Sequence, residues 1–231
     1  GMRLTWVDAG HILGAASAIL DITEPDAHGQ PHSRRLVVSG DIGTRHRPIM
    51  NDPVRIERAD VLIVESTYGD RLHRSLQETE DELVEVITTT LRQGGNVVMP
   101  AFAVGRTQEV IAILLDLIRR KRLPFLSIFV DSPMATAASR ITQSHLNILD
   151  RDTQNLFAWL QSHPNAAHIR FTADVNDSKA LNQIKGGAII LSASGMCEAG
   201  RIVHHLFWNL PRPQCSVVIT GFQAAGTRGR A

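Results

Sequence analysis

The spacing of apolar residues changes at Ser75, and this change constrains the fold more than any other feature of the sequence. Ser75 and Glu78 form a capping-box pattern, and apolar residues then recur at helical spacing until Gly94-Gly95. The pattern predicts a helix of about 18 residues. Strand-like and helix-like segments alternate from there onward. Because repeated strand–helix units build parallel sheets covered by helices, we expect a doubly wound, mostly parallel α/β domain over residues 75–231.

The predicted elements of this domain are short. The expected strands cover residues 97–101, 126–130, 169–172, 188–192 and 217–220. The expected helices cover residues 110–118, the segment after Ser132-Pro133, residues 153–161, the segment after Asp177, and residues 200–208. The first of these strands is not followed by a GxGxxG sequence, which argues against a dinucleotide ligand.

Residues 1–74 follow a different pattern, in which β-branched residues and leucine lie between turn formers. Strands are expected at residues 3–7, 18–22, 36–39 and 61–65, with an exposed hairpin loop at 26–32.

Two connections in this region place a potential metal ligand next to glycine. His11 follows Gly10, and Asp41 follows Gly40. Imidazole and carboxylate together suit zinc, although residues at strand ends commonly serve only as caps or turn formers.

Composition and charge exclude several classes of protein. The chain has 24 basic and 23 acidic side chains, and a formal net charge of +1 indicates no particular partner. A hydrophobic content of 43% predicts a globular protein with buried cores. No apolar run approaches the length that spans a bilayer, and the two cysteines form no disulfide framework. We therefore expect a cytoplasmic protein with no membrane partner.

Four segments that follow predicted strands are rich in glycine and small polar residues: 102–106, 131–134, 193–196 and 221–227. In a parallel sheet all of them reach one edge, where ligands usually bind. Small residues let an anion approach the N–H groups at helix N-termini. We therefore predict contacts with a phosphate-bearing ligand. The residues expected to make them are Arg106, Ser132, Ser194 and Gly195. Simple capping of each loop is the alternative interpretation.

The motifs of both regions occur in a fixed order. Residues 9–17 (AGHILGAAS), 39–41 (SGD) and 65–70 (ESTYGD) are followed by 100–109 (PAFAVGRTQE), 131–135 (DSPMA), 192–196 (SASGM) and 200–206 (GRIVHHL). Over essentially the whole chain, this set resembles the metallo-β-lactamase-fold nucleases of the β-CASP family. The resemblance implies a Rossmann-like β-CASP domain over residues 75–231. It implies that residues 1–74 are the C-terminal part of the first metallo-β-lactamase half.

The resemblance also implies roles for three side chains in a centre with two zinc ions. His11 would be a zinc ligand, and Asp41 would be the catalytic carboxylate that bridges both ions. Glu65 would support a histidine that protonates the leaving group while hydroxide attacks phosphorus. The sequence at Glu65 resembles that of RNA-directed members, including those that process mRNA 3′ ends. The implied substrate is single-stranded RNA, cut internally, from its 5′ end, or both.

The HxHxDH and SAHxD motifs of the family are not found in the sequence. We therefore expect a segment of a longer zinc-dependent ribonuclease that is inactive by itself and binds zinc only partly or not at all, because zinc takes about four ligands. Missing strands would leave an apolar face through which copies could form a homo-oligomer.

The adjacent histidines His204 and His205 should point in different directions on a helix, and they match no zinc ligand of the family. The alternative function is a non-catalytic α/β module that binds RNA or a mononucleotide.

Overall fold

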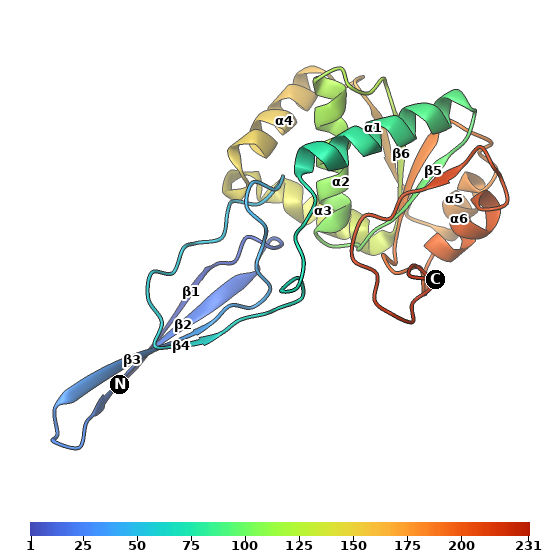
Figure 1. The fold of residues 1–231 in the computed structure, drawn as a ribbon. Helices are drawn as coiled ribbons and strands as arrows, with labels where there is room; N and C mark the ends of the chain where they lie inside the picture. The colour runs from blue at the N-terminus through green and yellow to red at the C-terminus, as the bar shows by residue number, and fades with distance from the viewer. The chain divides into compact units, whose positions relative to one another are not determined.

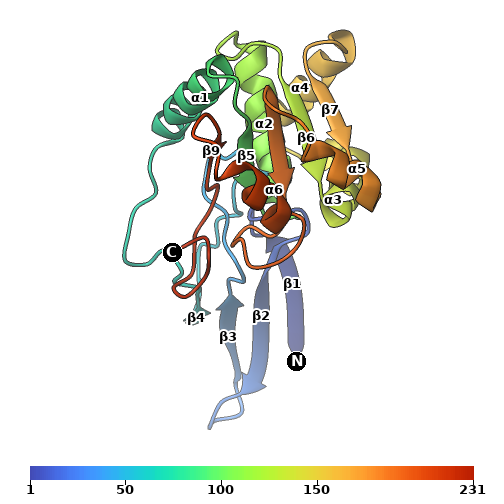
Figure 2. The ribbon, with the colours of Figure 1, turned by 90° about the vertical axis from the view of Figure 1, so that its right-hand side faces the viewer.

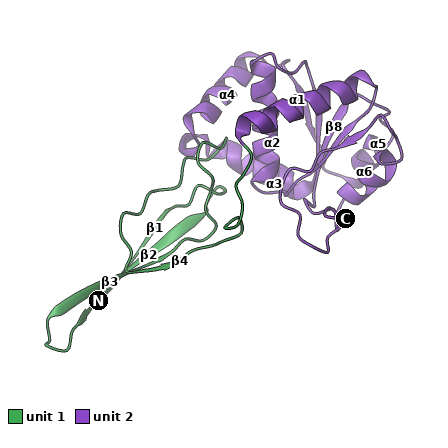
Figure 3. Ribbon diagram, in the orientation of Figure 1, with its two compact units in different colours: residues 1–74 green, residues 75–231 purple.

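The structure is a computed structural model that describes residues 1–231, and it divides the chain into two compact units. Unit 1 comprises residues 1–74 and unit 2 comprises residues 75–231 (Figure 3). The division falls where the sequence changes from strand-like to helical spacing, because the first helix begins there.

Unit 1 contains a four-stranded sheet in the order β1-β2-β3-β4. The strands are β1 (Met2–Asp8), β2 (Ala16–Pro25), β3 (Pro31–Val38) and β4 (Val61–Ile63). The first three strands pair antiparallel, and β4 runs parallel to β3. Between β2 and β3 the Asp26 N–H donates to the Gln30 carbonyl at 2.8 Å. This contact closes the hairpin loop that the turn-forming residues predicted.

One side of β1 carries large apolar side chains that no other part of the structure covers. Met2, Leu4 and Trp6 alternate along the strand and are 74%, 54% and 64% exposed. Alternate residues of a strand point to the same face of a sheet. Unit 1 therefore has an apolar face of the kind expected from the sequence, while association between copies of the chain stays a prediction.

Unit 2 contains a five-stranded parallel sheet. Its strands are β5 (Val97–Pro100), β6 (Ser127–Asp131), β7 (His168–Phe171), β8 (Ala188–Ser192) and β9 (Ser216–Val217). Its helices are α1 (Leu76–Arg92), α2 (Arg106–Arg119), α3 (Pro133–Ser144), α4 (Arg151–Ser162), α5 (Val175–Leu181) and α6 (Ile202–Asn209), with a 3-10 turn η1 (Leu146–Ile148). None of the helices combines the length and the apolar character needed to cross a membrane.

The strand order in unit 2 is β7-β6-β8-β5-β9, and every neighbouring pair is parallel. Helix α2 lies on one face of the sheet, and α5 and α6 lie on the other (Figure 1 and Figure 2). Every residue of β5 and β8 is buried, as is typical of parallel strands covered on both faces. The doubly wound α/β fold is thereby confirmed.

The core of unit 2 joins this sheet to α1 and α2. Leu114 and Leu117 of α2 are fully buried in one cluster with Ile128 of β6, and Ile87 of α1 belongs to the same cluster. Burying each such side chain contributes roughly 2 kcal/mol. The core therefore fixes the strands, and with them the loops that follow their carboxyl ends.

Helix α1 begins where the capping-box pattern predicted. The Ser75 Oγ accepts a hydrogen bond from the Glu78 N–H at 3.2 Å, and the Ser75 N–H donates to the Glu78 carboxylate at 3.0 Å. The helix has 17 residues, so both its start and its length agree with the sequence.

Two predicted helix starts are wrong for local reasons. Helix α5 begins before Asp177, because Asp174 caps it and accepts a hydrogen bond from the Asp177 N–H at 2.8 Å. Helix α2 begins at Arg106 instead of residue 110, because the loop already ends at Gly105 with a φ of +79°, which glycine adopts without strain.

The strands β4 and β9 are shorter than predicted and end at Ile63 and Val217. Beyond β9 the Val218 N–H still donates to the Val98 carbonyl at 2.9 Å, but the chain then turns into a loop. Residues 218–220, which the sequence predicted to be strand, therefore form a loop that lies against β5.

Candidate functional site

Two loops of unit 1 place His11 and Asp41 on neighbouring stretches of backbone. The Gly43 N–H donates to the Ala9 carbonyl at 2.8 Å. A Cβ on Gly43 would lie 1.8 Å from the Gly10 carbonyl oxygen, so the close approach of the two loops requires glycine there. Both His11 and Asp41 are exposed. The structure thus brings the loops of the two predicted metal ligands together.

Glu65 lies beside the Asp41 loop, and the backbone fixes its carboxylate. The Glu65 Oε1 accepts a hydrogen bond from the Ile42 N–H at 2.8 Å. This bond, followed by one from the Thr67 hydroxyl, lowers the pKa of Glu65 below its ordinary value, and His11 adds a smaller contribution in the same direction. Glu65 is therefore ionised at neutral pH. A carboxylate held in this way can accept a further hydrogen bond from a group that it orients.

The donors that unit 1 supplies do not make a zinc site by themselves. Zinc in proteins takes about four ligands, and no group of three or more His, Cys, Asp or Glu side chains is placed to hold a metal ion. His11 and Asp41 are only part of such a set. No reaction step through a metal ion follows from these residues alone.

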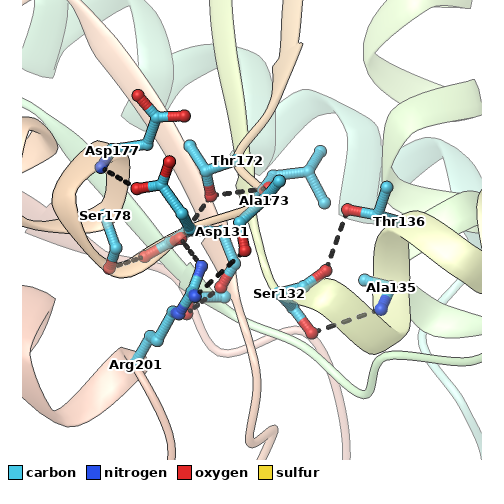
Figure 4. A network of polar contacts seen from close by, with 12 residues as sticks. Asp131, Ser132, Ala135, Thr136, Thr172, Ala173, Asp177, Ser178 and Arg201 are labelled. Carbon is cyan, nitrogen blue, oxygen red and sulfur yellow. Dashed lines mark hydrogen bonds and ion pairs between the residues drawn. The ribbon is translucent and has the colours of Figure 1, made fainter.

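In unit 2 several polar side chains converge on Asp131, the last residue of β6 (Figure 4). The Asp131 side chain is completely buried. Its Oδ1 accepts hydrogen bonds from the Arg201 Nη1 at 2.7 Å and from the Thr172 hydroxyl. Its Oδ2 accepts from the Ser178 Oγ at 2.6 Å and contacts the His205 Nε2 at 2.6 Å. We call these five residues the Asp131 cluster.

The Asp131 cluster holds a buried negative charge. Burial alone would raise the pKa of the Asp131 carboxyl, but the hydrogen bonds from the four donors outweigh it and hold the pKa well below its ordinary value. Because an ionised carboxylate can only accept, the His205 Nε2 carries a proton. The donors come from α5, from α6 and the Arg201 that precedes it, and from the residue after β7, so one anionic group links these elements to the end of β6.

The adjacent histidines behave as predicted for neighbours on a helix. His204 is exposed, whereas the His205 side chain is completely buried against Asp131. Asp131 is the first residue of the motif at 131–135, but the residue predicted from the sequence to bind a ligand there was Ser132. The available signal was an acidic residue at the end of a buried strand, directly before a Ser-Pro helix start.

The four predicted phosphate contacts have different surroundings. Ser132 is 6% exposed, and its Oγ caps α3 by accepting a hydrogen bond from the Ala135 N–H at 3.2 Å. The capping interpretation therefore accounts for Ser132. Arg106, the first residue of α2, has a side chain that is 31% exposed and an ion pair with Glu109 at 2.6 Å. Its Nε lies 3.9 Å from where a Cβ on Gly221 would be.

Ser194 and Gly195 lie in the loop after β8. The Ser194 Oγ is buried and has no hydrogen-bond partner. The Gly195 carbonyl accepts a hydrogen bond from the Gln223 Nε2 at 2.9 Å, and a Cβ on Gly195 would lie 3.1 Å from the ring of Phe102. Arg106 lies at the end of the loop after β5, and Ser194 and Gly195 lie in the loop after β8; both loops contact the segment after β9 that contains Gly221 and Gln223. We call residues 102–106, 193–200 and 220–229 the strand-end loops.

Comparisons with known proteins agree with this architecture. The family model for the Beta-Casp domain matches residues 107–231. The chain is 35% identical over 228 residues to Ribonuclease TTHA0252 of Thermus thermophilus, covering 99% of this chain and 50% of that protein.

Two further relatives come from an archaeon and a yeast. Transcription termination factor FttA of Methanothermobacter thermautotrophicus is 33% identical over 234 residues, which are 99% of this chain and 35% of that protein. Endoribonuclease ysh1 of Schizosaccharomyces pombe is 30% identical over 235 residues, which are 100% of this chain and 29% of that protein. The chain spans half or less of the length of these curated relatives.

Proposed function

Because the chain belongs to the β-CASP family, we propose that it is the part of a ribonuclease that holds single-stranded RNA while a phosphodiester bond is hydrolysed. The support comes from relatives of 30% to 35% identity that are named as ribonucleases or as a transcription termination factor. The observation that carries the proposal is the Glu65 carboxylate, which the Ile42 N–H holds at 2.8 Å beside the loop of Asp41.

Ribonucleases of this family are metal-dependent, and we propose zinc as the metal. His11 and Asp41 would contribute to a centre of two zinc ions whose remaining ligands lie outside this chain. Within the chain, the task of Glu65 is to stay ionised and to orient the histidine that delivers a proton to the leaving oxygen. The Ile42 N–H keeps the carboxylate in one position, so that this histidine would be held at a fixed angle.

In unit 2 the strand-end loops are proposed to bind the RNA backbone. Arg106 offers guanidinium N–H groups beyond its bond to Glu109. The Ser194 hydroxyl has no partner within the protein but is buried, so it would reach a phosphate only after a shift of the loop that follows β8. Guanidinium and hydroxyl groups both suit phosphate oxygens. Such contacts position the strand without reading its bases, so binding should depend weakly on sequence.

The test is a titration of labelled single-stranded RNA at several salt concentrations. Arg106→Ala should reduce the slope of the logarithm of the association constant against the logarithm of salt by about one unit. The matched control is Arg119→Ala at the other end of α2, because Arg119 is also paired three residues away, with Asp116, and its side chain is 33% exposed. For Arg119→Ala the salt dependence of the association constant should equal that of the unsubstituted protein.

A mononucleotide added as competitor addresses the alternative function. If the mononucleotide binds tightly and RNA does not, a nucleotide-binding module replaces the proposed ribonuclease. Equal slopes for Arg106→Ala and Arg119→Ala would remove Arg106 from the binding surface.

A further inference from the structure

Two phenylalanines lie partly exposed on the strand-end loops. Phe102 follows β5 and is 44% exposed, and Phe222 follows β9 and is 37% exposed. Large apolar side chains at the carboxyl edge of a parallel sheet lie where such folds bind ligands. The exposed part of each ring is therefore open to a ligand with a flat apolar surface.

The ring of Phe102 packs against the loop at Gly195. A Cβ on Gly195 would lie 3.1 Å from Cδ2 and 3.2 Å from Cε2 of that ring. Any side chain at this position would force the ring to move, since contacts this short are tighter than normal packing. Gly195 therefore keeps one side of the ring packed against the loop, while the rest of it stays exposed.

Gln223 and the strand register place Phe222 near the same loop. The Gln223 amide donates to the carbonyls of Gly195, Gly221 and Phe222 at 2.9, 3.2 and 3.1 Å. The Thr220 hydroxyl donates to the Pro100 carbonyl at 2.8 Å, so the segment after β9 runs alongside the end of β5. Both phenylalanines therefore belong to one surface, which also includes the guanidinium of Arg106 beside Gly221.

We propose that Phe102 and Phe222 form a stacking surface for unpaired nucleobases. The inference rests on the proposed function and adds to it the part of the substrate that touches these rings. A phenylalanine side chain has no polar atom, so its exposed chemistry is the face and edge of the ring, which nucleobases match by stacking. Arg106 can meet the phosphate of the same nucleotide.

This surface selects for single-stranded RNA without reading sequence. Bases in a duplex are stacked on one another and cannot reach a protein ring, whereas every unpaired base presents a π face. Phosphate contacts alone would accept both forms. The rings therefore supply the discrimination that Arg106 and Ser194 lack.

The experiment compares two single-stranded oligomers of equal length, one of RNA and one in which the central nucleotides carry no base. Phe102→Ala should weaken binding of the base-bearing oligomer by about five-fold or more and leave binding of the abasic oligomer unchanged. The salt slope should stay that of the unsubstituted protein, because no phosphate contact is lost. Phe222→Ala should act in the same way.

The matched control is Phe125→Ala. Phe125 is 57% exposed and precedes β6, at the opposite edge of the sheet, so its loss should affect neither oligomer. Phe102→Leu keeps an apolar side chain against Gly195 but removes the ring, and Phe102→Tyr keeps the ring. Weakened binding for leucine and normal binding for tyrosine separate stacking from loss of folding.

Equal affinity for the two oligomers, combined with a normal salt slope, would overturn the stacking proposal while the proposed function stands. Equal effects of Phe102→Ala and Phe125→Ala, or equal affinity for duplex and single strand, would also overturn it. The absence of any salt-dependent RNA binding would overturn the proposed function and the stacking surface together.

Discussion

Replacing Asp131 with asparagine tests whether the Asp131 cluster stabilises unit 2. The substitution keeps the shape of the side chain but removes its charge and turns one acceptor oxygen into a donor. The 20%-exposed Arg201 then loses its counter-charge, and the completely buried His205 loses the carboxylate that accepts its Nε2 proton. At least one of the donors that now reach the carboxylate is left without an acceptor.

The expected loss of stability is about 3 kcal/mol. Removing one partner of a buried ion pair typically costs about 3 to 5 kcal/mol, and the lower end applies because Arg201 keeps some contact with solvent. For a domain of this size each kcal/mol lowers the melting temperature by roughly 2 to 4 °C, so Asp131→Asn should lower it by about 6 to 12 °C. Urea denaturation monitored by circular dichroism gives the free energy of unfolding directly.

The pH dependence provides a second measurement. The folded-state pKa of Asp131 lies below its ordinary value, so its contribution to stability is complete above about pH 4 and is lost as pH falls from there toward the folded pKa. The free energy of unfolding of the unsubstituted protein should therefore drop by more than that of Asp131→Asn as pH falls below about 4.

The control is Arg170→Gln, which breaks the ion pair with Asp177 at 2.8 Å, whose side chains are 51% and 36% exposed. Solvent screening limits that loss to about 1 kcal/mol or less. If Asp131→Asn costs no more than Arg170→Gln, or if both proteins lose the same stability in acid, the account of a buried charge that links several elements is refuted.

Three further predictions concern the metal, the catalytic carboxylates and the first helix. After washing with chelator, the chain should hold less than one zinc ion by elemental analysis, since zinc takes about four ligands; two ions per chain would contradict this. In a longer protein that carries the HxHxDH and SAHxD motifs, Asp41→Ala should abolish RNA cleavage and lower the zinc content, whereas Glu65→Gln should slow cleavage and keep the zinc; equal metal loss would reject this division of roles. Ser75→Ala should reduce the free energy of unfolding of unit 2 by about 1 kcal/mol through loss of the helix cap, with no change in urea midpoint as the opposing result.

Local patterns in the sequence were sufficient to predict the elements. The capping box at Ser75 and Glu78 involves residues three positions apart. The residues next to it in the sequence therefore determine where α1 begins. The spacing of apolar residues in strands and helices is also a local property. It predicted the alternation of strands and helices from which the parallel sheet of unit 2 follows. Boundaries that depend on tertiary contact, such as the end of β9, were predicted less well.

The Asp131 cluster could not be predicted, because its partners lie far away in the sequence. Thr172 is 41 positions from Asp131 and His205 is 74 positions away. No local sequence pattern predicts either contact. Gly195 shows a related limit. A glycine that lets an anion approach and a glycine that seats an aromatic ring look identical in the sequence, and only the contact with Phe102 separates them.

The order of strands in unit 2 has a consequence for synthesis on the ribosome. β5 is the first strand of its sheet to be made, yet Val97 pairs with Ile189 and Ser216, which are made late. At about 5 to 20 residues per second, β5 waits roughly 5 to 20 seconds for its first neighbour. Until then α1 and α2 can cover one of its faces, but both of its edges stay open. A nascent chain that stalls before β8 therefore exposes an apolar strand with two unpaired edges, the form most prone to aggregate.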